Sequence, residues 1–302
     1  MRRFSALVVA ASVTAALTAC AGVGGAAGCA SSVPSGDAAS IVEADSKFGS
    51  APEVTFPTPL ITRSLERSVL IQGGGETVQE GQPVILEATI LNGADASVLQ
   101  QTPYAADGGS LFTVGDDGLP ALGPGLACAT VGSRVAVVAP GGENGEAAAT
   151  EDSIVYVVDV LSAYPSRATG TAQLPVVGMP SVVGAPDGTP GITIPNEDAP
   201  TDYRLSVLKR GGGDVVEDDE AVVVKFTAVD WETSEVTTST WSTGSAAILD
   251  LEGTAVSEGL RQAIAGEKIG SQILAVLPPG LAGSAEAPAT STLVYVVDIL
   301  GT

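Results

Sequence analysis

The chain has 302 residues, of which 35 are acidic and 13 are basic, so its net charge is −22. Such a surface repels the phosphates of nucleic acids and of anionic lipids, and we expect no nucleic-acid partner. Histidine is absent, which excludes imidazole general bases, histidine-containing triads and histidine zinc sites. No motif calls for a cofactor or a metal, and we expect none.

Residues 1–19 have the features of an export signal. Two arginines precede an apolar stretch that is too short to cross a bilayer, which takes about 20 residues. The motif Leu17-Thr-Ala-Cys20 resembles the lipobox of bacterial lipoproteins, whose cysteine is acylated. Small residues dominate the next stretch and predict a flexible tether over residues 20–50. We therefore expect an extracytoplasmic protein, attached by an acyl group on Cys20 to the outer face of the bacterial cell membrane. This anchor is the only membrane contact we expect.

The chain contains three cysteines. If Cys20 is acylated, Cys29 and Cys128 remain, and they can pair outside the cytoplasm. Because Cys29 lies in the predicted tether, the sequence leaves this pairing open.

One sequence pattern occurs twice in the chain. Ser68-Val-Leu-x-x-Gly-Gly-Gly returns as Ser206-Val-Leu-x-x-Gly-Gly-Gly, and Ile154-Val-Tyr-Val-Val-Asp returns as Leu293-Val-Tyr-Val-Val-Asp. Matches in nearly one register across about a hundred residues indicate a duplication. We predict three segments after the tether: a first domain over 51–162, a linker over 163–188 and a second domain over 189–302.

Each copy consists mainly of predicted strands. In the second copy, the apolar and β-branched runs Ala221–Val229, Gln272–Leu277 and Thr292–Ile299 predict buried strands. One short helix is expected, with Ser257 as its N-cap and Gly266 as its C-terminal stop. This content predicts an α+β domain in which a bent antiparallel sheet wraps one short helix.

The pattern resembles the FKBP family of peptidyl-prolyl cis-trans isomerases, and the arrangement resembles bacterial lipoproteins with two tandem FKBP-like domains. The resemblance is carried in the second copy by the Gly-Gly-Gly213 turn, Val222–Phe226, Glu258-Gly-Leu260, Lys268-Ile-Gly-Ser271, Pro278-Pro279 and Leu293–Asp298. It implies a monomer that acts on proline-containing polypeptides. Prolyl isomerisation breaks no covalent bond and must lower a rotational barrier of about 20 kcal/mol. A dry, aromatic-lined pocket can do this without histidine or a nucleophile.

The resemblance assigns the pocket of the second copy to Phe226, Val256, Leu260 and Tyr295. Phe226 replaces the tyrosine of the family, and Leu260 replaces the tryptophan that forms the pocket floor. Thr237-Thr238 replaces a Phe-Asp pair. The pocket is therefore depleted, and we expect weak activity.

The first copy departs further from the family. Its counterparts of Phe226, Val256 and Leu260 are Ala88, Gly118 and Leu122. Gly123-Pro124-Gly125 is expected to break the helix below the pocket. Tyr156 remains and is interpreted as a core residue. We therefore expect isomerase activity in the second copy alone.

Besides a calcium-dependent adhesive β-domain, for which the acidic cluster Glu217-Asp-Asp-Glu220 lacks the EF-hand spacing, two functions stay open on the sequence. The repeated family pattern favours an isomerase or folding helper that acts outside the cytoplasm. The missing floor tryptophan and Phe-Asp pair favour a non-catalytic FKBP-like binding or structural surface lipoprotein. A prolyl isomerase assay separates the two.

Overall fold

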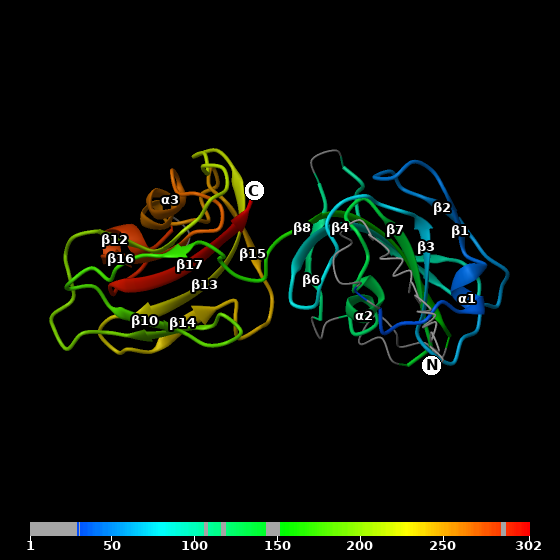
Figure 1. Ribbon diagram of the computed structural model, residues 1–302, viewed down its shortest axis with the longest axis horizontal. Helices are drawn as coiled ribbons and strands as arrows, with labels where there is room; N and C mark the ends of the chain where they lie inside the picture. Colours follow the sequence, from blue (N-terminus) through cyan, green and yellow to red (C-terminus); the bar gives the residue numbers. More distant parts are fainter. Residues whose placement is uncertain (1–28, 30, 106–107, 116–118, 143–151, 285–287) are drawn as a thin grey trace, which may run out of the picture. The chain divides into compact units, whose positions relative to one another are not determined.

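The computed structural model describes residues 29, 31–105, 108–115, 119–142, 152–284 and 288–302. The expected leader, Cys20 and Gly118 lie outside these residues. Both cysteines within the described part, Cys29 and Cys128, are disulfide-bonded. No helix in this part is long and apolar enough to cross a membrane. The described residues form two large β-sheets and two two-stranded sheets, and short helices accompany the large sheets (Figure 1).

The first sheet has six strands in the order β3-β7-β8-β4-β5, and β6 pairs with β4 on the same edge as β5. All of these pairs are antiparallel. The strands are β3 (Glu66–Ile71), β4 (Pro83–Asn92), β5 (Val98–Gln101), β6 (Ser110–Thr113), β7 (Arg134–Ala139) and β8 (Ile154–Ala163). Helix α2 (Leu122–Leu126) packs against one face of this sheet through Leu122 and Leu126.

The second sheet repeats this order as β12-β16-β17-β13-β14, with β15 on the edge of β13 and β9 added beyond β12. Its strands are β9 (Thr171–Ala172), β12 (Arg204–Arg210), β13 (Ala221–Asp230), β14 (Val236–Ser239), β15 (Ala247–Asp250), β16 (Gln272–Leu277) and β17 (Leu293–Gly301). Helix α3 (Glu258–Ile264) packs on it, and a one-turn helix, α4 (Pro279–Ala282), follows β16.

These elements confirm the three strands and the helix expected in the second copy. The side-chain oxygen of Ser257 accepts a hydrogen bond from the Leu260 N–H at 3.2 Å, as an N-cap does. Gly266 follows the helix with a φ of +82°, a conformation that glycine adopts without strain.

The glycines and proline of α2 do not abolish the helix of the first copy, contrary to expectation. Pro124 is the third residue of this five-residue helix. Backbone N–H groups in the first turn have no helical acceptor, so a proline is tolerated there. The helix is two residues shorter than α3.

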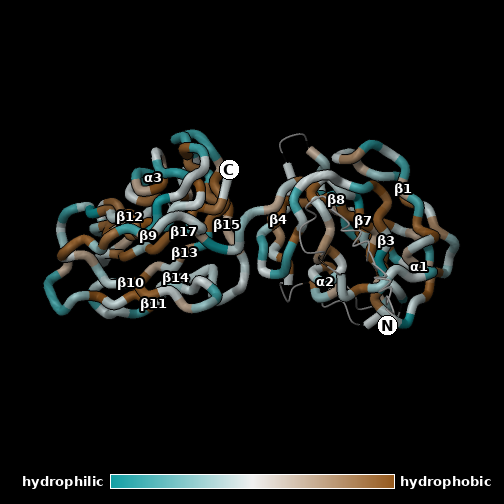
Figure 2. Tube along the Cα trace, viewed as in Figure 1, coloured by the Kyte–Doolittle hydropathy of each residue, from teal (hydrophilic) through white to brown (hydrophobic). Residues whose placement is uncertain are grey.

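The strand β8 is apolar on both of its faces. Ile154, Tyr156 and Val158 belong to the core that contains α2, whereas Val155 and Val157 belong to a cluster on the opposite face. Successive residues of a strand point to opposite faces, so both faces of the sheet must be covered. Figure 2 shows the hydrophobic colour following the central strands of both sheets.

A segment that precedes the first sheet covers this second face, which we call the outer face. It consists of α1 (Asp37–Ser40) and the hairpin of β1 (Glu43–Asp45) and β2 (Glu53–Thr55). Ala38, Ala39 and Val42 are buried in the cluster that contains Val155 and Val157. The sequence predicts a flexible tether through residue 50. Residues 37–45 instead form α1 and β1, and they are ordered because they cover apolar residues of the strands.

The outer face of the second sheet is covered in the same way. The hairpin of β10 (Ser181–Gly184) and β11 (Pro190–Thr193) packs through Val182 and Ile192 on the cluster that contains Trp231. Within the predicted linker over 163–188, β9 therefore pairs with the second sheet and β10 packs on its outer face. Below, the first arm is the segment from α1 through β2, and the second arm is the segment from residue 163 through β11.

A row of polar side chains crosses the outer face of the first sheet. Glu87 on β4 is the register partner of Asp159 on β8, which is the partner of Arg134 on β7. The Arg134 guanidinium donates two hydrogen bonds to the Asp159 carboxylate, from Nε to Oδ1 at 2.6 Å and from Nη2 to Oδ2 at 2.7 Å. Both side chains are fully buried. The Glu87 carboxylate, also buried, has no hydrogen-bond partner among the described residues.

This ion pair attaches the first arm to the sheet. The Gly49 N–H donates to Asp159 Oδ2 at 2.7 Å. Arg134 donates to three backbone oxygens of the arm, those of Ser46, Lys47 and Ser50. Because charged partners strengthen hydrogen bonds in a dry environment, these contacts hold the arm firmly.

The second sheet has the corresponding row with different residues, Lys225, Asp298 and Gln272. Gln272 Nε2 donates to Asp298 Oδ1 at 2.6 Å, and the Ala168 N–H of the second arm donates to Oδ2 at 2.8 Å. Burial raises the pKa of Asp298, although these two hydrogen bonds act to lower it. The Lys225 ammonium lies 4.8 Å from the ring centroid of Trp241. In both domains, a buried aspartate therefore accepts a hydrogen bond from a backbone N–H of the arm.

Replacing Arg134 by methionine leaves the Asp159 carboxylate buried without its cation. We expect the free energy of unfolding of the first domain to fall by about 3–5 kcal/mol, the usual cost of breaking a buried pair. Chemical denaturation followed by far-ultraviolet circular dichroism measures this change.

The substitution Arg134→Gln is the matched control, because Gln272 already serves the equivalent aspartate. It should cost less than Arg134→Met. Trp231 and Trp241 are the two tryptophans of the chain, so fluorescence reports the second domain alone. Equal stability of Arg134→Met and the parent protein would contradict the role given to the pair.

Candidate functional site

A cavity of about 340 Å³ lies beside α3 in the second domain. All four side chains that the sequence assigns to a pocket line it, namely Phe226, Val256, Leu260 and Tyr295. Its described lining residues carry no charged side chain. The cavity therefore suits an uncharged, apolar group.

The two aromatic rings of the cavity come from neighbouring strands. Phe226 on β13 is the register partner of Val297 on β17, and Tyr295 is the partner of Ala228, so the rings lie diagonally across the ladder on one face. Their centroids are 6.1 Å apart and their planes are inclined at 40°. Tilted aromatic pairs at such distances are favourable.

The Tyr295 hydroxyl keeps its proton at physiological pH. Burial raises the pKa of Tyr295 above its ordinary value of 10.0. The ring therefore presents a neutral hydroxyl, not a phenolate.

Helix α3 supplies the other wall of the cavity. Ser257 caps the helix, and Leu260 follows one turn later, where it faces the cavity. Val256 and Leu260 are 8% and 6% exposed, so this wall is closely packed. The cap on Ser257 thus fixes where the helix begins and where its side chains point.

Gly259 allows α3 and α4 to approach closely. A Cβ placed on Gly259 would lie 2.8 Å from the Leu281 carbonyl oxygen, too close for any other residue. The close approach brings Ala282 to the rim of the cavity. A glycine inside a predicted helix is the sequence signal for such a contact.

Leu249 and Leu293 also line the cavity, although the sequence resemblance does not mark them. Leu293 belongs to the same face of β17 as Tyr295 and Val297, so the two-residue period of the strand could have identified it. Leu249 lies on the short edge strand β15, which the sequence pattern does not reveal.

The arrangement can bind a small apolar ring and remove water from the bond beside it. Among the described residues, the side chains that enclose the cavity are mainly aliphatic and aromatic, with the hydroxyls of Thr238, Ser257 and Ser284 and no charged acid or base. Binding here would act through burial and desolvation, which lower rotational barriers and do not break bonds.

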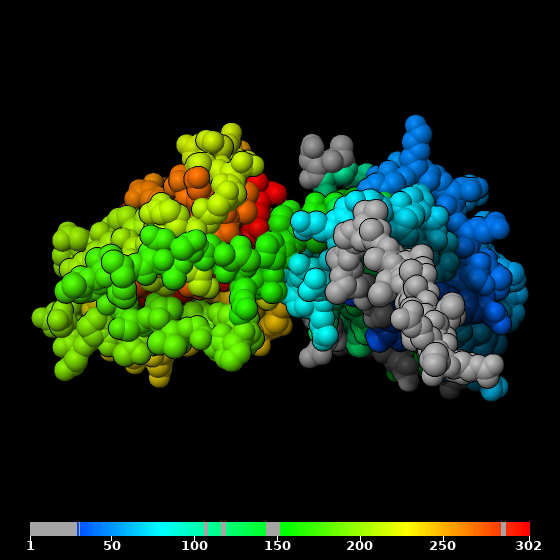
Figure 3. Space-filling model, viewed as in Figure 1, coloured from blue at the N-terminus to red at the C-terminus, as the bar shows by residue number. Residues whose placement is uncertain are grey.

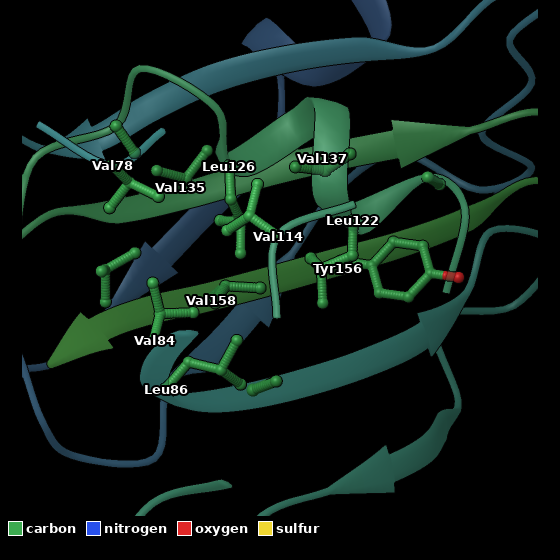
Figure 4. Close-up of a cluster of buried hydrophobic side chains, with 14 of the residues drawn as sticks. Val78, Val84, Leu86, Val114, Leu122, Leu126, Val135, Val137, Tyr156 and Val158 are labelled. Carbon is green, nitrogen blue, oxygen red and sulfur yellow. The ribbon is translucent and has the colours of Figure 1, made fainter. Parts of the chain in front are cut away.

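The equivalent region of the first domain is a packed core. Tyr156, the counterpart of Tyr295, is fully buried beside Leu122 and Val158, as Figure 4 shows. This burial confirms the interpretation of Tyr156 as a core residue. Ala88 takes the place of Phe226 and provides no ring.

The Tyr156 hydroxyl has no hydrogen-bond partner among the described residues. Burial raises the pKa of Tyr156 to about 12. Tyr156 is thus the counterpart of a pocket aromatic, but it is buried in the core and lines no accessible pocket.

A match to a family model concerns the same region. Residues 213–300 match the family model of FKBP-type peptidyl-prolyl cis-trans isomerase. The chain is 30% identical over 115 residues to a protein of Corynebacterium glutamicum described as "Probable FK506-binding protein"; the match covers 37% of this chain and 96% of that protein. All the described lining residues of the cavity lie within the residues matched by the family model.

Two solved structures are also similar to the chain. The three FKBP domains of wheat FKBP73 match with 19% identity and a TM-score of 0.33, covering 79% of this chain and 94% of that one. FkpA from Escherichia coli matches with 25% identity and a TM-score of 0.29, covering 39% of this chain and 50% of that one.

The substitution Tyr156→Phe removes the buried hydroxyl that has no partner. We expect the free energy of unfolding of the first domain to stay unchanged or to rise by about 1 kcal/mol, because an unsatisfied buried polar group is costly. Denaturation followed by circular dichroism measures this, with Tyr295→Phe as the matched control in the second domain.

The same variant should alter the response to alkaline pH. The pKa of Tyr156 is about 12 in the folded chain, against an ordinary value of 10.0. The folded state therefore holds this proton longer, and stability is lost as the pH rises from about 10 towards 12. Tyr156→Phe should lose less stability over this range; a parallel decline in both proteins would count against the assignment.

Proposed function

Because the chain belongs to the FKBP-type peptidyl-prolyl cis-trans isomerase family, we propose that its second domain isomerises prolyl bonds of polypeptides outside the cytoplasm. The observation that carries this proposal is the apolar cavity that gathers Phe226, Val256, Leu260 and Tyr295. The proline-containing segment of a partly folded protein is the proposed substrate.

The cavity would act on the bond that precedes proline. The proline ring would lie against Phe226 and Tyr295, with Leu260 beneath it. The planar imide is more polar than the twisted form, because resonance gives its C–N bond partial double-bond character. An apolar environment removes water from the imide and so favours the twisted form relative to bulk solvent.

We propose that this activity is weak. Leu260 offers an aliphatic wall where the family has an indole, and Thr238 is the residue at the rim where the family has an acidic acceptor. A twisted imide therefore receives fewer directed contacts than in a complete pocket of the family. The first domain, whose Tyr156 is fully buried, would serve as a spacer or as a holding module.

The second candidate is a non-catalytic surface lipoprotein that binds a polypeptide through the same cavity. The aliphatic floor and the absence of charged lining side chains among the described residues favour this alternative. Binding without acceleration of isomerisation would distinguish it from the leading proposal.

Tyr295→Ala and Phe226→Ala should each lower kcat/KM of the full chain for a proline peptide tenfold or more, which corresponds to about 1.4 kcal/mol of transition-state stabilisation. Exchange NMR or protease-coupled kinetics measures the rate. Tyr104→Phe in the first domain is the control and should leave the rate unchanged.

Before the rates are interpreted, the second-domain variants must be shown to be folded by tryptophan fluorescence and Tyr104→Phe by circular dichroism. A folded parent protein that gives no acceleration at high concentration would overturn the catalytic proposal. Binding of the peptide under the same conditions would then support the non-catalytic candidate.

We also propose that Cys20 carries an acyl anchor. Expression of the full chain in a bacterium with lipoprotein processing should give a membrane-bound protein, and Cys20→Ser should move it to the soluble extracytoplasmic fraction. Cell fractionation and mass spectrometry of the processed N-terminus measure the outcome, with Cys29→Ser as the control. Equal distribution of Cys20→Ser and the parent protein would contradict the anchor.

A further inference from the structure

The second arm exposes a cluster of aliphatic side chains. Leu174, Val176 and Val177 are 90%, 52% and 100% exposed, and Pro175 lies between them. We call residues 174–177 the apolar loop; it connects β9 to β10. Figure 3 shows the green segment that contains it on the surface of the second domain. Contiguous exposed apolar groups on a soluble domain mark contact with a protein or a membrane.

The apolar loop is held away from the core by its two ends. Before it, the Gln173 N–H donates to the Leu208 carbonyl at 2.8 Å, which extends the pairing of β9 with β12. After it, Met179 packs on the outer face, and its N–H donates to the Val176 carbonyl. The aliphatic side chains thus project from a turn whose two ends are fixed by hydrogen bonds and packing.

Charge around the loop differs from that of the whole chain. No acidic residue occurs from residue 160 to residue 186, although the chain contains 35. Two exposed arginines lie beside the loop on β12: Arg204 donates to the Gly178 carbonyl at 3.3 Å, and Arg210 is the register partner of Thr171. Asp202 is the acidic residue nearest to Arg204 in the sequence.

Only local charges act at a contact in physiological salt, where the screening length is about 8 Å. The net charge of −22 therefore does not determine how this edge of the second domain behaves. Exposed aliphatic groups flanked by arginines suit a bilayer interface, because the aliphatic groups can contact the acyl chains while the arginines contact the lipid phosphates.

We propose that the apolar loop is a membrane-contact site, which inserts Leu174 and Val177 into a lipid interface while Arg204 and Arg210 meet lipid phosphates. The exposure of Leu174 and Val177 favours lipid over a polypeptide, because a wholly exposed side chain fits a deformable layer, whereas a protein partner would need a matching groove. This proposal does not depend on isomerase activity.

Flotation with phosphatidylcholine vesicles and with vesicles of phosphatidylcholine and phosphatidylglycerol in equal amounts tests the proposal. The chain from residue 21 onward is used, so that neither the apolar leader nor an acyl group contributes to binding. We expect it to bind the anionic vesicles more tightly. Adding Leu174→Ser and Val177→Ser should weaken binding about tenfold or more. Arg204→Gln with Arg210→Gln should remove the preference for anionic vesicles.

Val98→Ser and Val236→Ser provide matched controls, because both valines are more than half exposed on other strands. They should leave vesicle binding unchanged. Absence of binding to either vesicle, or equal binding by the loop variant, would overturn the proposal. If vesicles fail to bind and the loop substitutions instead reduce affinity for an unfolded polypeptide, the loop is a protein-binding site and the lipid assignment is wrong.

Discussion

A buried carboxylate at the centre of each outer face is the interaction on which both domains depend. Asp159 and Asp298 occupy equivalent positions on β8 and β17, and each accepts a backbone N–H from the arm that precedes its sheet. Burying such a charge is tolerated only when hydrogen bonds satisfy it. The arm is therefore a required part of each domain, since it supplies one of those bonds and covers the apolar residues around the carboxylate.

The arm and the cavity lie on opposite faces of the second sheet. The arm covers the apolar centre of the outer face, and the cavity that gathers the assigned pocket residues lies on the face that packs against the helix. There the two copies differ by a few side chains: Phe226 and Tyr295 leave a cavity beside α3, whereas Ala88 and Tyr156 belong to a filled core in which α2 packs closely. A substitution on the face that packs against the helix could thus alter the cavity without disturbing the attachment of the arm on the outer face.

Much of this architecture can be predicted from the sequence. The duplication, the three central strands and the helix capped by Ser257 follow from residue patterns, and the four assigned pocket residues do line one cavity. The arms escape prediction because their Ala-, Gly- and Pro-rich composition is typical of linkers, and only long-range contacts such as Gly49 to Asp159 order them. The clue lies in the central strands: the run Ile-Val-Tyr-Val-Val has no polar face, so some other segment must cover its second side. For the contact of Gly259 with Leu281, the glycine within the predicted helix signals a close approach, but local patterns do not identify the partner.

The difference between the two polar rows has a consequence for the folding of tandem repeats, which are prone to exchange strands between copies. Glu87 of β4 and Lys225 of β13 occupy the same position in their sheets but carry opposite charges. If β4 entered the second sheet, Glu87 would replace Lys225 beside Asp298 and the neutral Gln272, and Lys209 would be the remaining cation that acts on Asp298. The reverse exchange would place Lys225 in a row that already contains Arg134. The two rows thus differ at one buried register position, so exchanging β4 and β13 would change the charge balance of both rows.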